Sequence, residues 1–243
     1  AGAILLARLL ITGPATITMT GAEAGTVTWL DGSALTFSEI ETVNYTACFT
    51  AGSRITTMRG EVRAEDIVVG DRVLTRDNGY QTVRWVGATR LSAERLKAEP
   101  HRQPVRVKAG ALGNDLPRKD MMVSPQHRVL LCGATAELML GAEEVLVMAR
   151  DLCALQGVRR AQTKGGVTYV HFMFDQHELV LTDGHWTESF QPGDLSLTGM
   201  DDAQREEIFA LFPDLAEARG FDSYPSARVA LKSFEAQALL AMI

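Results

Sequence analysis

The chain has 243 residues, a formal net charge of −6 and a pI near 5.4, and 46% of its residues are hydrophobic. This length and composition exclude a disordered chain and fit one large domain, or one domain with small appendages. The negative charge argues against a nucleic-acid-binding protein, because acidic residues interrupt even the most basic stretch, Arg84 to Arg106.

The cysteine content and the apolar runs exclude further classes. Three cysteines, Cys48, Cys132 and Cys153, cannot all pair with one another, and no C-x-x-C spacing predicts a zinc site. We expect no disulfide framework, no metal and no other cofactor. The apolar run at residues 3–11 is shorter than the about 20 residues that span a bilayer, so we expect no membrane span. Because the chain does not begin with methionine, we expect a fragment or a processed product.

Residues 1–47 have the pattern of the end of another β domain. Residues 15–20 alternate small or polar residues with apolar ones. Residues 26–30 and 33–37 flank Asp31-Gly32, a pair that favours a type I′ turn, and so predict a hairpin.

The strand pattern continues from residue 48, with turn signals at Gly70-Asp71 and Asn78-Gly79. We predict a short helix over residues 91–99, mixed strands and short turns over 126–150, and a hairpin of residues 167–174 with 178–182. The predicted strands before that hairpin cover residues 72–76, 81–87 and 104–108.

After residue 192 the pattern becomes helical. Residues 201–211 have helical spacing, and a stripe of apolar residues predicts a second helix near the end of the chain; the stripe consists of Ala227, Leu231, Phe234, Ala238 and Met242. We therefore expect a mainly β protein with three parts: a flanking β segment (1–47), a β module (48–192) and a helical C-terminal extension (193–243).

Several residues in the β module have reactive side chains. Cys48 is surrounded by small residues, which allow close approach to its thiol, although most cysteines of this kind are only core residues. Ser124 and His127 lie three apart, so both side chains can face one atom at the end of a strand or in a turn. Asp175 and His177 share a face if they lie in a strand, which would pair a carboxylate with an imidazole.

The other histidines have plainer interpretations. We expect His171 to be only a strand residue, and we expect His101 and His185 to be exposed.

Taken together, these motifs resemble the Hint module, the self-processing domain shared by inteins and hedgehog C-terminal domains, and most closely its bacterial hedgehog/intein-like type. The order and spacing of four motifs carry the resemblance across roughly residues 48–190: Cys48–Ile55, Val69–Gly79, Ser124–Arg128, and Val167–His171 continuing through Asp175–His177 to Asp183-Gly184. The resemblance implies a compact β module, a horseshoe of strands with pseudo-twofold symmetry.

The resemblance also implies a reaction. Cys48 would attack the carbonyl carbon of Ala47 and convert the amide into a thioester, and water or another small nucleophile would then cleave it. His127 matches the histidine that acts on the scissile amide nitrogen, and Ser124 stands where the family usually has threonine. Asp175 and His177 match the late motif, and the partner implied is the chain's own flanking polypeptide.

The chain departs from the family pattern downstream. Inteins end in His-Asn before a second nucleophile, and the corresponding place here is Thr187-Glu188-Ser189. Glutamate does not cyclise readily as asparagine does, so we do not expect full splicing, and Ser189 is only a weak candidate for the downstream nucleophile. Hedgehog domains have an aspartate in the interval that precedes the motif matched by Ser124–Arg128. Asp115 and Asp120 lie in that interval, but neither matches the position of that aspartate. No segment resembles a sterol-recognition region.

Three functions remain open at this point. The first is a single-turnover domain that cleaves itself before Cys48, and the second is a catalytically silent Hint fold with a structural or secretion-associated role. The third is a cysteine hydrolase that acts on other molecules through Cys48, His127 and Asp175. The sequence does not determine the oligomeric state, and an exported bacterial protein is expected by resemblance only.

Overall fold

The computed structural model describes residues 15–19, 25–29, 34–37, 47–192, 202–216 and 224–243. The chain divides into two compact units, Ala1–Tyr45 and Thr46–Ile243. In the first unit β1 (Ala15–Met19), β2 (Gly25–Trp29) and β3 (Ala34–Phe37) form an antiparallel sheet in the order β1-β2-β3. The pairing of β2 with β3 confirms the predicted hairpin, although its turn lies outside the described residues.

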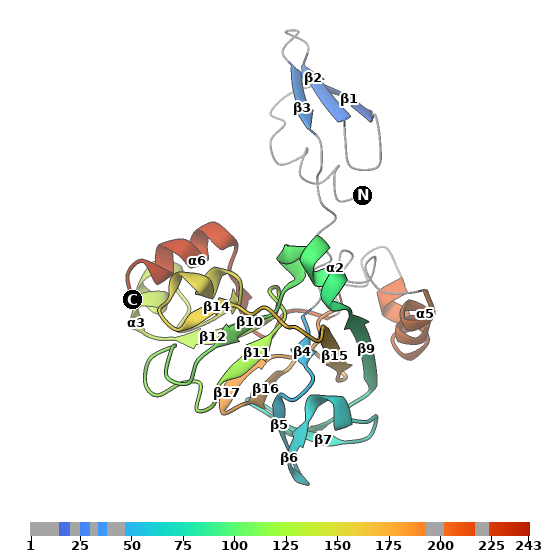
Figure 1. Ribbon diagram of the computed structural model, residues 1–243, viewed down its shortest axis with the longest axis vertical. Coiled ribbons are helices and arrows are strands. Elements are labelled where there is room, and N and C mark those ends of the chain that lie inside the picture. The colour runs from blue at the N-terminus through green and yellow to red at the C-terminus, as the bar shows by residue number, and fades with distance from the viewer. Residues whose placement is uncertain (1–14, 20–24, 30–33, 38–46, 193–201, 217–223) are drawn as a thin grey trace. The chain divides into compact units, whose positions relative to one another are not determined.

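The second unit contains two sheets (Figure 1). The six-stranded sheet has the order β14-β10-β11-β4-β15-β9, and the nine-stranded sheet has the order β18-β13-β12-β17-β16-β5-β7-β8 with β6 paired to β5. The mainly β prediction is therefore confirmed. The strands of the six-stranded sheet are β4 (Phe49–Thr50), β9 (Trp85–Leu91), β10 (Val105–Val107), β11 (Met121–Val123), β14 (Val158–Arg160) and β15 (Val167–Met173).

The nine-stranded sheet is built largely from hairpins. Its strands are β5 (Arg54–Thr57), β6 (Gly60–Arg63), β7 (Arg72–Thr75), β8 (Gly79–Thr82), β12 (Arg128–Cys132), β13 (Glu144–Met148), β16 (Leu179–Thr182), β17 (His185–Glu188) and β18 (Val229–Ala230). The predicted strand at residues 72–76 is confirmed as β7. The predicted strand at residues 81–87 is divided at Val83-Arg84 between β8 and β9.

A buried cluster joins the two sheets near the middle of the unit. Phe49 of β4 stacks on Phe172 of β15, with ring centroids 4.7 Å apart, and Ile55, Val73 and Val180 complete the contact from the nine-stranded sheet. A second cluster contains residues of β10–β13 together with Leu231 and residues of α6 (Ser233–Leu240). Burying these apolar side chains is the main favourable contribution to stability, and it fixes β4 in the interior.

The helices differ partly from the prediction. The short helix predicted at residues 91–99 is present as α2 (Ala93–Ala98), with Ser92 as its N-cap, and the first C-terminal helix is present as α5 (Asp202–Leu211). The prediction of strands and turns over residues 126–150 missed α3 (Ala134–Leu140). This helix ends at Gly141 in a left-handed conformation, which glycine adopts without steric cost.

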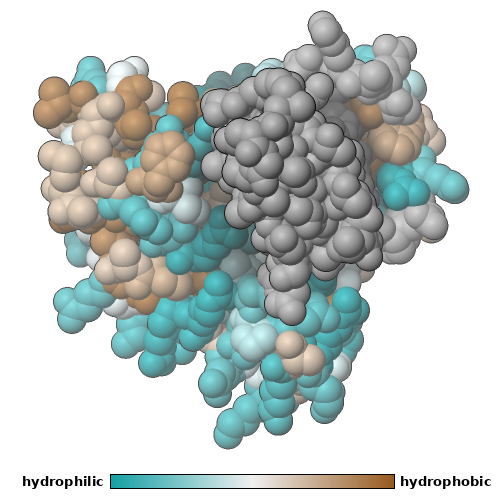
Figure 2. Space-filling view, turned by 90° about the horizontal axis from the view of Figure 1, so that it is seen from above, coloured by the Kyte–Doolittle hydropathy of each residue, from teal (hydrophilic) through white to brown (hydrophobic). Residues whose placement is uncertain are grey.

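Two further predictions were wrong. Residues 167–174 and 178–182 do not form a hairpin, because β15 pairs with β4 and β9 whereas β16 pairs with β17, β5 and β7. The apolar stripe in the C-terminal extension is not one buried face: Leu231 is buried, but Phe234 is 66% exposed, while Ala236 and Leu239, outside the stripe, are buried. The chain is extended through β18 before α6 begins, so the helical spacing of the stripe does not continue from Ala227 into the helix. Figure 2 shows apolar surface at the left, where α3 and α6 lie side by side.

Candidate functional site around the Ala47–Cys48 peptide

The register of three strands determines the surroundings of Cys48. β4 lies between β11 and β15 (Figure 1), with Phe49 opposite Val123 on one side and Val170 on the other. Because both neighbours are antiparallel, one step back along β4 is one step forward along each neighbour. Cys48 is therefore flanked by Ser124 and His171.

Ser124 contacts the Ala47–Cys48 amide directly. The Cys48 N–H donates to the Ser124 hydroxyl oxygen at 3.1 Å, and the Ser124 N–H donates to the Cys48 carbonyl oxygen at 3.0 Å. The nitrogen that leaves in an acyl shift is thus held by a hydroxyl from the neighbouring strand. Ser124, which stands where the family usually has threonine, therefore contacts the nitrogen of this peptide through its hydroxyl.

His171 contacts one atom of the same peptide unit and the thiol next to it. Its Nδ1 lies 2.9 Å from the Ala47 carbonyl oxygen, and its Nε2 lies 3.4 Å from the Cys48 sulfur. His171 is a strand residue of β15, as predicted, but the sequence analysis did not foresee these contacts. A sequence signal exists, because a buried strand of apolar residues rarely contains a histidine unless its ring nitrogens have partners.

Burial controls the protonation of this site. Ala47 and Cys48 are 8% and 5% exposed, and His171 is 4% exposed. Desolvation raises the pKa of the Cys48 thiol above its ordinary value, against the opposing effect of its hydrogen bond with Ser124. Desolvation also lowers the pKa of His171 to about 4, so both groups are neutral at pH 7.

His127 is buried and contacts Phe49, the residue after Cys48, but its ring makes no hydrogen bond to the Ala47–Cys48 peptide. Its ring packs against the edge of Phe49, with centroids 4.7 Å apart, and its backbone N–H donates to the Ser124 carbonyl. Of the residues that the structure describes, none has a polar atom within hydrogen-bond distance of either ring nitrogen of His127. Burial lowers the pKa of His127 to about 4, although the negative charge of Glu188 opposes the shift.

The family model for the Hint domain matches residues 47–194, which begins at the peptide described above and covers more than half of the chain. The chain belongs to the Hint family. No curated protein matches the sequence.

Several solved structures are similar to the Hint module at low identity. The intein-like domain of Clostridium thermocellum is 14% identical, with a TM-score of 0.38 over 58% of this chain and 97% of that chain. The gp41-1 intein is 13% identical, with a TM-score of 0.36 over 58% and 97%. The MchDnaB-1 intein is 15% identical, with a TM-score of 0.35 over 59% and 98%.

Asp175 and His177 of the Hint module do not pair as expected, because β15 ends at Met173 and the two residues therefore do not share a strand face. Asp175 lies at the surface and accepts hydrogen bonds from Arg84 at 2.9 Å. His177 is buried, and its Nδ1 accepts the backbone N–H of Ala227 at 3.0 Å. Because Nδ1 accepts, Nε2 is the nitrogen that donates, and it lies 3.3 Å from the Ser189 carbonyl oxygen.

Near the downstream end of the Hint module, the side chains of Glu188 and Ser189 are buried and hydrogen-bonded. The Glu188 carboxylate accepts the Arg128 backbone N–H at 2.7 Å and its guanidinium at 3.0 Å, and it lies 3.5 Å from His177 Nε2. Burial alone would raise its pKa, but the charge of Arg128 and the contact with His177 lower the pKa to about 2. The Ser189 hydroxyl accepts the Glu178 N–H at 3.0 Å, and the side chains of Glu188 and Ser189 are inaccessible to solvent.

The remaining candidate residues lie outside this constellation. Asp115 is exposed in a loop, and Asp120 accepts hydrogen bonds from Arg106 and from the Ala109 N–H. His185 is buried rather than exposed, contrary to expectation, because its Nε2–H donates to the Leu130 carbonyl at 2.8 Å, and His101 is half-buried.

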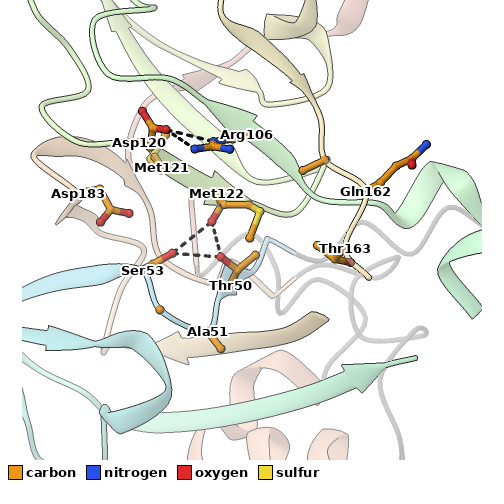
Figure 3. Close-up of a pocket in the computed structure, with 12 residues that line it drawn as sticks. Thr50, Ala51, Ser53, Arg106, Asp120, Met121, Met122, Gln162, Thr163 and Asp183 are labelled. Carbon is orange, nitrogen blue, oxygen red and sulfur yellow. Dashed lines mark hydrogen bonds and ion pairs between the residues drawn. The ribbon is translucent and has the colours of Figure 1, made fainter. Parts of the chain in front are cut away.

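A pocket of about 370 Å³ opens beside β4, two residues beyond Cys48 (Figure 3). The hydroxyls of Thr50 and Ser53 donate to the Met122 carbonyl there, at 2.7 and 3.2 Å. Asp183 lies at the pocket edge and accepts the Arg54 N–H at 3.1 Å, and burial raises the pKa of Asp183 to about 6.

Within the described ranges, no group of three or more His, Cys, Asp or Glu side chains is placed to hold a metal ion. None of the helices there is long and apolar enough to cross a membrane.

Proposed function

We propose that this Hint chain cleaves its own backbone between Ala47 and Cys48. The observation that carries the proposal is that three reacting atoms, the Ala47 carbonyl oxygen, the Cys48 nitrogen and the Cys48 sulfur, each have a polar partner in or next to a neighbouring strand. The carbonyl oxygen and the sulfur contact His171, and the amide nitrogen contacts Ser124. Three such contacts around one buried peptide orient it for attack by the thiol.

The reaction begins when the Cys48 sulfur attacks the Ala47 carbonyl carbon. The C–N bond then breaks, the acyl group stays on sulfur as a thioester, and the nitrogen leaves as the amine of Cys48. An amide is more stable than a thioester, so the shift proceeds only when a second nucleophile consumes the thioester. Water or a small thiol would release residues 1–47 from the module.

The geometry favours cleavage at this one bond over splicing. Splicing needs an asparagine at the downstream junction, and the corresponding stretch is Thr187-Glu188-Ser189. Glu188 is held as a carboxylate by Arg128, and its neighbour Ser189 is held by Glu178, so neither side chain is placed to attack a carbonyl carbon. His127, which the resemblance places at the scissile nitrogen, makes no hydrogen bond to that atom.

The two other functions fit the site less well. A hydrolase acting on other molecules needs an accessible nucleophile, and Cys48 is only 5% exposed. Asp175 is paired with Arg84 at the surface, so the Cys48, His127 and Asp175 set is not assembled. A silent module would retain the buried thiol without cleavage, and the experiment below distinguishes this outcome.

The test compares the purified full chain with Cys48→Ala at pH 7, each with and without dithiothreitol, by intact-mass spectrometry. We expect the wild type to yield a fragment that begins at Cys48, faster with the thiol, and Cys48→Ala to stay whole. Hydroxylamine should convert the released flank to a hydroxamate at Ala47. An intact wild type, or equal fragmentation of the variant, would show that the module is silent or that the cleavage does not use the thiol.

A further inference from the structure

We propose that His171 is the acid–base catalyst of the acyl shift and also the donor that stabilises its oxyanion. The inference rests on the proposed cleavage, and it assigns the proton transfers to a residue on β15 rather than to His127. It follows from the positions of the two ring nitrogens, which contact the two atoms of the Ala47–Cys48 unit that first change charge.

The tautomer of His171 follows from its partners. A carbonyl oxygen can only accept, so the contact of 2.9 Å with the Ala47 oxygen places the proton on Nδ1. In the neutral ring Nε2 then has a lone pair. The Cys48 S–H lies 3.4 Å away and donates to that lone pair. One side chain therefore presents a donor to the electrophile and an acceptor to the nucleophile.

In the attack step, the thiol, the carbonyl group and the His171 ring account for every proton and electron pair that moves. The thiol proton moves to Nε2 while the sulfur electron pair forms the S–C bond to Ala47. The carbonyl π pair moves onto oxygen, where the Nδ1–H of the now cationic ring donates to it. The positive ring and the negative oxygen appear together at hydrogen-bond distance, so each stabilises the other in a site from which water is excluded.

When the intermediate breaks down, the His171 ring gives up the proton that it took from the thiol. In the cyclic intermediate the sulfur and the nitrogen of Cys48 are bonded to one carbon, so Nε2–H next to the sulfur is also close to the nitrogen. The oxygen pair re-forms the C=O bond, the C–N bond breaks, and the nitrogen takes the proton from Nε2. The ring is neutral again, and no net proton is gained or lost.

His127 lacks these contacts. Both histidines are buried, and both are neutral at pH 7, so protonation alone does not distinguish them. Their geometry does, because the ring nitrogens of His127 have no polar partner among the described residues, whereas both nitrogens of His171 meet reacting atoms.

The test uses the full chain and variants that separate the two nitrogens. In His171→Asn the side-chain amide can replace the Nδ1 donor but not the Nε2 base, and in His171→Gln it reaches toward Nε2 but lacks Nδ1. We expect about 10²- to 10⁴-fold slower thiol-induced cleavage in both, the range typical of lost acid–base catalysis. His185→Gln is the matched control, since His185 is equally buried but bonds Leu130 in the other sheet, and its rate should stay near that of the wild type.

A second measurement does not depend on the folding of the His171 variants. In Cys48→Ala, ¹⁵N NMR of the imidazoles at pH 7 should show His171 neutral with its proton on Nδ1. A proton on Nε2, or a cationic ring, would overturn the inference.

The outcomes separate the two proposals. If the wild type cleaves and Cys48→Ala does not, while His171→Asn cleaves within threefold of the wild type, the cleavage stands and His171 is not the catalyst. If His127→Asn is slowed more than His171→Asn, proton transfer belongs to His127. If the wild type does not cleave, or Cys48→Ala cleaves equally, both proposals fail together.

Discussion

At the scale of single residues, the site combines a thiol that is hard to ionise with an imidazole that is hard to protonate. The pKa of Cys48 is raised and that of His171 is lowered, both by burial. Neither group is reactive alone, but a proton passed directly between them avoids separating charge into an apolar interior. Cys48 and Ser124 were predicted from local motifs. His171 was missed because its role depends on strand register, which no local motif encodes.

Asp183 provides a stability prediction at this scale. The pKa of Asp183 is raised to about 6, which means that the folded state disfavours the charged carboxylate. The contribution of Asp183 to stability is therefore full below the ordinary pKa near 3.8 and is lost as pH rises through 6. Asp183→Asn should keep the acceptor for the Arg54 N–H and tolerate the φ of 51°. Allowing for solvent at the pocket edge, we expect it to stabilise the fold by about 1 kcal/mol at pH 8.

Urea unfolding at pH 8 and pH 4 measures the effect of Asp183→Asn. The gain should vanish at pH 4, where both Asp183 and its replacement are neutral. An equal gain at both pH values would show that it comes from the backbone conformation and not from the charge.

At the scale of elements, the ion pair between β12 and β17 provides the clearest prediction. Glu188 is fully buried, and Arg128 supplies its main positive partner. Arg128→Met leaves the buried Glu188 carboxylate with only the backbone N–H of residue 128 and His177 nearby. We therefore expect the free energy of unfolding to fall by about 2–4 kcal/mol. Glu188→Gln should cost less, because the remaining guanidinium is partly exposed and can be hydrated.

A double-mutant cycle of Arg128→Met with Glu188→Gln, followed by chemical denaturation, measures this coupling. The double variant should be more stable than Arg128→Met alone, because it contains no unpaired buried charge. Additive losses would contradict the assigned pairing.

The sequence predicted elements best where the pattern is local. The β2–β3 hairpin, β7, α2 and α5 follow from turn residues and helical spacing. The pairing of β16 was mispredicted because proximity along the chain favoured a hairpin with β15. Instead, β15 belongs to the sheet that contains β4, and the short segment after Met173 takes the chain into the other sheet. Long-range pairing of this kind depends on tertiary packing.

At the scale of the whole molecule, buried titratable groups predict how stability depends on pH. The pKa values of His127 and His171 are lowered to about 4, so their contribution to stability is complete above the ordinary value of 6.5 and is lost as pH falls from 6.5 to 4. Glu188 extends the loss as pH falls from 4.5 toward its folded pKa of about 2. Asp183 acts in the opposite direction between pH 6 and 3.8.

We expect a net loss in the free energy of unfolding on the order of 3 kcal/mol between pH 7 and pH 4.5, since two histidines outweigh one aspartate. Urea midpoints at several pH values measure this change. A flat profile over this range would contradict the assignment of both imidazoles as neutral in the folded state.

The mainly β class and the family resemblance were both predicted from order and spacing, and the match over residues 47–194 confirms them. The face of the last helix was not predictable, because β18 changes the phase of the chain just before α6 and leaves Phe234 outside. Side-chain periodicity identifies a buried face only within one uninterrupted element.

The burial of Cys48 has a consequence for the direction of the reaction. The acyl shift that we propose would create an amine where the chain had an amide, at a position that is 5% exposed. An interior site disfavours the ammonium form, so the new amine remains a nucleophile beside the thioester it has just left. We therefore expect reversal to be fast and the thioester to stay a minor species, which commits to cleavage only when an outside nucleophile intercepts it. On this proposal the chain would persist uncut for long periods and respond to the supply of small thiols around it.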